Sequence, residues 1–106
     1  MIFIVVKFPV KAEYVDQWPE LVREFTDATR AEPGNKWFDW SRSLEDPYEF
    51  VLVEAFDDDA AGDHVNSPHF EKMTRDFPQY LRATPKIISR QMEGDDWDEM
   101  GELQVG

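Results

Sequence analysis

Both histidines of this chain lie in one heptapeptide, "HVNSPHF", at residues 64–70. Imidazole titrates near neutral pH, so it can act as a general base, and it also binds metals. On an ideal helix the spacing of five would place His64 and His69 about 140° apart, and Ser67–Pro68 interrupts a helix between them. This differs from the i, i+4 pair that binds zinc in H-E-x-x-H sites. We therefore expect the two imidazoles to face different directions and not to share a metal.

The same heptapeptide supplies three candidate catalytic residues: His64, His69 and Asn66. Either imidazole could remove a proton from a substrate, and the Asn66 amide could stabilise an oxyanion. Each also has an ordinary structural role, because a histidine at a helix end bonds to a carbonyl oxygen or to solvent, and Asn caps helix C-termini. The sequence does not decide which histidine would act.

Two strand-like segments carry further candidates. In "KWFDWSRSL" (residues 36–44), Trp40 and Arg42 share one face, and a tryptophan there often borders a pocket that is part apolar and part polar. In "YEFVLVEAF" (residues 48–56), Glu54 interrupts an apolar run, although a buried carboxylate is costly unless it is paired. Arg42 is the expected partner. A structural salt bridge and an active-site acid both fit Glu54.

The elements that must position these residues follow the order β-α-β-β-α-β. Apolar runs predict strands, spacings of three and four predict helices, and Pro19 predicts a kink in the first helix. Ser67–Pro68 predicts the start of the last helix, and Pro78 its end or a bend. The expected ranges are strand 2–9, helix 12–31, hairpin strands 36–44 and 48–56, a short helix from 57 or 58, a helix from 68, and strand 84–92. This order predicts the α+β class with the ferredoxin-like split βαβ fold.

The composition supports one domain, residues 1–92, followed by an acidic tail, residues 93–106. The net charge of −12 argues against nucleic acids and anionic membranes as partners. The chain has no cysteine, which excludes disulfides and thiolate metal sites and is compatible with a cytoplasmic location. We expect the apolar N-terminus to be a strand and not a signal peptide, since it lacks a basic lead-in and a cleavage site. The tail is expected to be solvated, or alternatively to dock through Trp97 or Met100.

The predicted strands also bear on assembly. Residues 2–9 and 48–56 carry apolar side chains on both faces, whereas the helices can cover only one face of the sheet. An uncovered apolar face usually marks an interface. We therefore expect a two-fold homodimer packed sheet against sheet.

Three segments resemble the antibiotic biosynthesis monooxygenase (ABM) family: "RAEPGNKWFDWSRSLEDPYEFVLVEAF", "HVNSPHF" and "TPKI". The most specific parts are the E-P-G turn, the E-x-F strand end and the H-V-x-S-x-H-F segment. The resemblance covers about residues 1–90. It implies a dimeric α+β barrel. It also implies that the family members that are enzymes oxidise quinols or phenols with O₂ and without metal or flavin. No sequence signal for a flavin, nicotinamide or nucleotide is present, so we expect no cofactor.

Carried onto this sequence, the resemblance implies a site between sheet and helices with His64, Asn66 and His69 on the helical side. From the strands we expect Trp40, Arg42, Glu54 and Phe56 to bind a small aromatic substrate. Related haem-degrading members place a haem-ligating histidine where this chain has "FEKMTRD", without histidine, so haem oxygenation is disfavoured. The alternatives are an isomerase of a small carbonyl compound and a non-catalytic dimeric ligand-binding or stress-response protein.

Overall fold

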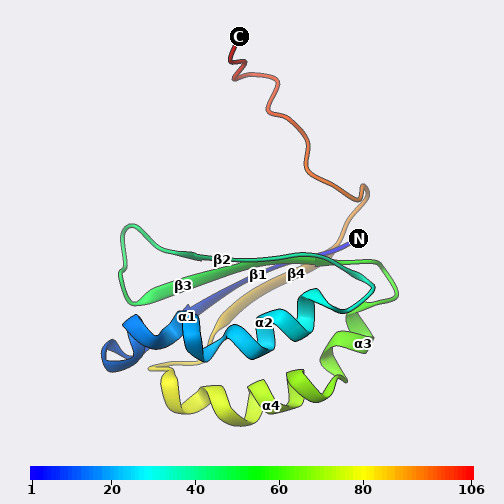
Figure 1. The fold of residues 1–106 in the computed structure, drawn as a ribbon. Coiled ribbons are helices and arrows are strands. Elements are labelled where there is room, and N and C mark those ends of the chain that lie inside the picture. Colours follow the sequence, from blue (N-terminus) through cyan, green and yellow to red (C-terminus); the bar gives the residue numbers. More distant parts are fainter.

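A four-stranded antiparallel sheet carries all the helices on one of its faces (Figure 1). The computed structural model describes residues 1–106. The strand order is β2-β3-β1-β4, which is the ferredoxin-like arrangement expected from the sequence. The strands are β1 (Ile2–Pro9), β2 (Asn35–Arg42), β3 (Glu49–Phe56) and β4 (Lys86–Gln91).

The first helical region is divided into shorter pieces where the sequence predicted one kinked helix. Pro19 has no N–H group and is tolerated only in a first helical turn, so a new helix begins at Trp18. Val22 then separates this turn from the longer helix that follows. The pieces are the 3-10 helix η1 (Ala12–Gln17), α1 (Trp18–Leu21) and α2 (Arg23–Arg30).

The second helical region is broken at Ser67, as expected. The Ser67 Oγ accepts a hydrogen bond from the Phe70 amide at 3.2 Å, which caps α4. Pro78 ends this helix, and the chain continues as a 3-10 turn. The short helix α3 begins four residues after Asp57, since Asp57 first forms a turn with Ala60. The pieces are α3 (Ala61–Val65), α4 (Pro68–Asp76) and η2 (Phe77–Tyr80).

The core lies between the sheet and the helices, and its centre is aromatic. Trp18 is almost fully buried and packs against Phe8, Phe50 and Phe77 with ring centroids 5.4–6.0 Å apart. The inward-facing residues of β1 and β3 complete this layer. None of the helices combines the length and the apolar character needed to cross a bilayer.

The opposite face of the sheet carries no helix (Figure 1), and the strand registers place both apolar and polar side chains on it. The strand registers place Phe3, Val5 and Val53 on this face, and Ile88 there is 63% exposed. The tail contacts this face through Trp97, whose ring lies 6.4 Å from Phe3. The same ring lies 5.2 Å from Trp37, while Met100 stays exposed. Of the two docking candidates in the tail, Trp97 is the one that packs on the domain.

Candidate active site

One carboxylate brings the two histidines together. Glu32 Oε2 lies 2.8 Å from His64 Nδ1 and 2.5 Å from His69 Nε2. The expectation that the two imidazoles face different directions is therefore wrong. It assumed a continuous helix, whereas the chain turns at Ser67 between α3 and α4 and directs both rings to the same point.

Glu32 is the residue that the sequence analysis missed. It follows the C-terminus of α2, where its N–H bonds to the Thr29 carbonyl oxygen in the E-P-G turn before β2. The signal that could have identified it was this turn, which was used as a family motif but not considered as a source of a functional carboxylate. Its contacts to His64 and His69 span 32 and 37 positions of sequence, so no local spacing indicates them.

Glu54 lies on the other side of His64. Its Oε1 is 3.8 Å from His64 Nε2, the side chain is almost fully buried, and Oε1 has no hydrogen-bond partner. Burial, and to a smaller extent the nearby Glu32 carboxylate, raise the pKa of Glu54 to about 8. At neutral pH the Glu54 carboxyl group is therefore protonated and can donate a hydrogen bond.

The predicted partner of Glu54 lies elsewhere. The strand register pairs Glu54 with Phe38 and Arg42 with Phe50, two pairs further along the hairpin. Arg42 donates from Nε to the Pro47 carbonyl oxygen at 2.7 Å. The expected salt bridge between Arg42 and Glu54 is therefore wrong, because the hairpin register separates the two residues.

His64 has the protonation state that suits a general base. Only its Nδ1 reaches Glu32, and a carboxylate can only accept, so we assign the ring proton to Nδ1. Its Nε2 is left with a lone pair on the side of Glu54. Burial lowers the pKa of His64, against the opposing effect of Glu32, so the ring is neutral at pH 7. The Phe56 ring stacks on it at 4.7 Å and fixes its plane.

An apolar cavity of about 350 Å³ adjoins this cluster between the sheet and α4. Its polar side chains are Glu54, His64 and Thr74, and no lysine or arginine lines it. A cavity of this size and character suits a small, uncharged aromatic molecule. The apolar walls comprise Ile4, Val6, Phe8, Phe25, Leu52, Val65, Phe70, Met73, Phe77, Pro78, Leu81, Pro85 and Ile87.

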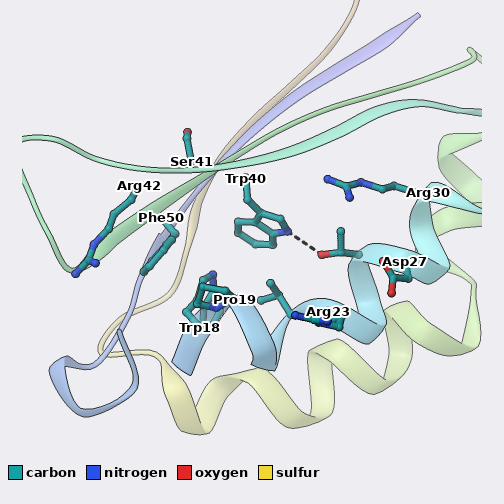
Figure 2. Close-up of a pocket in the computed structure, with 11 residues that line it drawn as sticks. Trp18, Pro19, Arg23, Asp27, Arg30, Trp40, Ser41, Arg42 and Phe50 are labelled. Carbon is teal, nitrogen blue, oxygen red and sulfur yellow. Dashed lines mark hydrogen bonds between the residues drawn. The ribbon is translucent and has the colours of Figure 1, made fainter. Parts of the chain in front are cut away.

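The remaining predicted residues do not line this cavity. Asn66 is exposed, and its side-chain Nδ2 donates to the Gly62 carbonyl oxygen at 2.9 Å, which is the ordinary capping role. Trp40 and Arg42 line a separate groove beside β2 (Figure 2). Phe56 contacts the site only through His64. The structure thus brings His64, His69, Glu54 and Phe56 together and leaves the other three outside.

The cluster also contains a donor set that could hold a metal. Glu32, His64 and His69 offer one carboxylate oxygen and two ring nitrogens within 4.8 Å of one another, as in sites with two histidines and one carboxylate. In the folded chain these atoms bond directly to each other, with one Glu32 oxygen shared by both rings. A cation would have to replace these hydrogen bonds.

Comparisons with known proteins agree with this fold. A family model described as antibiotic biosynthesis monooxygenase matches residues 1–76. A solved structure named antibiotic biosynthesis monooxygenase is 26% identical, with a TM-score of 0.77 over 89% of this chain and 100% of that one. A protein of Nitrosomonas europaea, provisionally given the same name, is 25% identical, with a TM-score of 0.79 over 89% of this chain and 100% of that one.

A more distant relative shows the fold alone. The Deinococcus radiodurans protein, also provisionally given this name, is 22% identical, with a TM-score of 0.81 over 95% of this chain and 100% of that one. No protein with a curated description matches the sequence.

Proposed function

Because the chain belongs to the antibiotic biosynthesis monooxygenase family, we propose that it oxidises a quinol or a phenolic substrate with O₂ and without a metal or organic cofactor. The observation that carries this proposal is the pairing of a neutral His64 with a protonated Glu54 at an apolar cavity. Two titratable groups whose pKa values are moved in opposite directions are typical of acid–base catalysis.

In the proposed reaction His64 is the base. A substrate hydroxyl group in the cavity gives its proton to Nε2, and Glu32 stabilises the imidazolium that forms. For a phenol whose para carbon bears hydrogen, that carbon combines with O₂ to give a hydroperoxide, and loss of water then gives the quinone. One oxygen atom enters the product, the other leaves as water, and the substrate supplies all the electrons. A quinol would instead give the quinone and hydrogen peroxide.

In this proposal Glu54 takes the stabilising role that the sequence suggested for the Asn66 amide. Its protonated carboxyl group can donate to the oxygen that gains negative charge during the reaction. The unpartnered Oε1 supports this role, because a buried polar atom without a partner is normally costly to the fold. The apolar walls exclude water, which strengthens this hydrogen bond. His69 bonds to the same Glu32 oxygen as His64 and acts as a positioning residue.

The absence of basic residues from the cavity weighs against the isomerase alternative. A phosphorylated carbonyl substrate would need several cationic side chains, and none lines this cavity. A non-catalytic binding protein is the remaining alternative, and the following experiment separates it from an oxygenase.

Oxygen uptake with 1-naphthol and a panel of hydroquinones, in buffer containing EDTA, tests the proposal. We expect turnover that His64→Gln lowers at least about 100-fold, because general-base catalysis contributes roughly 10²–10⁴-fold. Glu54→Gln should still bind the substrate and should lower turnover less than His64→Gln does. Asn66→Ala is the matched control and should leave turnover unchanged, since its amide only caps α3. Absence of oxygen uptake in this buffer, or uptake that occurs only when EDTA is left out, would contradict the proposal.

We also propose that two copies associate through the uncovered sheet face. Phe3, Val5, Val53 and Ile88 support this, since a row of apolar side chains that no helix covers favours association. The partners in this proposal are thus a small aromatic substrate, O₂ and a second copy of the chain.

A further inference from the structure

A second groove, of about 490 Å³, lies between the edge strand β2 and helices α1 and α2 (Figure 2). It shares no lining residue with the apolar cavity described above. Phe8, which lines that cavity, packs against Trp18 and Trp40, which line the groove. An aromatic wall therefore separates the two spaces, and a ligand of one does not occupy the other.

The groove concentrates positive charge in a strongly acidic protein. Arg23, Arg30 and Arg42 line it, three of the six arginines of the chain, whereas its only acid is Asp27. Arg23 is paired with Glu20. The groove therefore depends on the other two guanidinium groups for attracting an anion.

Arg30 and Arg42 are held by backbone oxygens and not by carboxylates. Arg30 donates from Nε and Nη2 to the Phe38 carbonyl oxygen at 3.1 and 2.8 Å. Arg42 donates from Nε to Pro47 at 2.7 Å and lies 5.4 Å from the centre of the Phe50 ring. Both guanidinium groups are thus held by backbone oxygens, neither is paired with a carboxylate, and both have N–H groups left to donate.

The wall between these arginines is aromatic and rigid. Figure 2 shows Trp40 between Arg42 and Phe50 on one side and Arg30 on the other. The Trp40 N–H donates to Thr26 Oγ at 2.9 Å, which fixes the indole plane. Trp18, nearly fully buried in the same lining, has an indole N–H without any partner. Flat apolar surface beside fixed cations selects a flat ligand that carries negative charge.

We propose that this groove binds an aromatic carboxylate, with its ring against the Trp40 side of the wall and its carboxylate on Arg30 and Arg42. A guanidinium group matches the two oxygens of a carboxylate, and an aromatic ring adds the apolar contact that an inorganic anion lacks. The uncharged substrates of the apolar cavity would not use these arginines. The groove is therefore a second ligand site, independent of the proposed oxidation.

Titration with 2-naphthoate, followed by ¹H–¹⁵N NMR, tests this site. The four tryptophans give four indole N–H signals: Trp18 and Trp40 line the groove, whereas Trp37 and Trp97 pack together away from it. We expect saturable shifts of the Trp18 and Trp40 signals, weakened by added salt, and no shift of the other pair. Uncharged 2-naphthol should not shift the groove signals at the same concentration.

Substitutions test whether Arg30 and Arg42 bind the carboxylate of 2-naphthoate. Arg42→Gln should weaken 2-naphthoate binding roughly tenfold, the effect of losing one charge-assisted contact, and Arg30→Gln should act similarly. Arg75→Gln removes an exposed arginine of α4 and is the matched control. Amide spectra of the unliganded variants check that β2 remains folded, and Arg42→Lys should restore part of the affinity.

Two results would overturn the proposal: arginine variants that bind 2-naphthoate as well as the parent, or shifts confined to Trp37, Trp97 or the residues around His64. His64→Gln should bind 2-naphthoate normally. A negative oxygen-uptake result would therefore not affect the 2-naphthoate test. A negative 2-naphthoate result would likewise not affect the proposed oxidation.

Discussion

At the scale of single residues, the candidate site depends on two carboxyl groups, one that is hydrogen-bonded to both histidines and one that is not. Glu32 accepts hydrogen bonds from two imidazoles, whereas Glu54 has no partner for Oε1 and is 5% exposed. A charged group without a partner is costly in such surroundings, so Glu54 retains its proton. Burial also lowers the pKa of His64, so its ring is neutral at pH 7. Acid and base thus arise from the same apolar environment.

The protonation of Glu54 predicts how stability depends on pH. In the folded chain Glu54 holds its proton up to about pH 8, but in the unfolded chain only to about 4.5. Between these values the folded state binds more protons, so the free energy of unfolding falls as the pH rises. Glu54→Gln, which cannot ionise, should remove this part of the pH dependence. At pH 9 it should be more stable than the parent by on the order of 1–3 kcal/mol.

Urea denaturation at pH 5, 7 and 9 measures this difference. Parent and variant both retain Glu32 and His64, so the difference between their profiles reports the ionisation of Glu54 in its folded surroundings. Glu71→Gln removes an exposed carboxylate from α4 and should leave the pH profile unchanged. An identical profile for Glu54→Gln and the parent would show that Glu54 is already ionised at neutral pH.

At the scale of elements, the junction between α3 and α4 decides where His69 points. Ser67 Oγ accepts from the Phe70 amide at 3.2 Å and donates to the His64 carbonyl oxygen at 2.6 Å. It therefore ties the end of one helix to the beginning of the next. With Pro68 in the first turn, this link directs α4 so that His69 reaches Glu32.

Ser67→Ala should consequently affect both stability and the site. Loss of the cap is expected to lower the free energy of unfolding by about 1–2 kcal/mol, because a cap bond and a buried hydroxyl contact are removed together. Ser67→Thr keeps both bonds and should recover most of the loss. Ser89→Ala, at an exposed position of β4, is the control for thermal unfolding. Equal unfolding midpoints for Ser67→Ala and the parent would contradict this role of the junction.

The order of the elements could be predicted from the sequence because the signals are local. Apolar periodicity, the Ser67–Pro68 helix start and the position of Pro78 act within a few residues of chain. The division of residues 12–31 into three pieces could not be predicted in full. The sequence indicated only a kink at Pro19, whereas neither proline nor glycine marks the additional break at Val22.

At the scale of the whole molecule, one face of the sheet is left without a helix. Figure 1 shows the tail leaving the domain on that side, and only Trp97 packs back onto it, against Phe3 and Trp37. Trp97 itself remains 64% exposed, so the tail covers only part of the face. A second copy of the chain would bury the rest.

A charge placed on this face should prevent the proposed association. Val53 lies on the open face, beside Val5 in the sheet register. We expect the parent to sediment as a dimer at micromolar concentration and Val53→Asp as a monomer, because burying an unpaired carboxylate is costly. Gln79→Glu adds a charge on the helical side and should remain dimeric. Sedimentation velocity distinguishes these outcomes, and a monomeric parent would exclude the dimer.

The sequence by itself determined the element order, the cap of α4 and the candidate status of His64, His69 and Glu54, since each depends on residue type and on short-range geometry. The tertiary structure decided which of them meet. Glu32 contacts its two histidines across more than thirty residues, and the hairpin register separates Arg42 from Glu54. Such contacts depend on how the E-P-G turn packs against the α3–α4 junction. The free energy of that packing is shared by the whole core and is not encoded in any short segment.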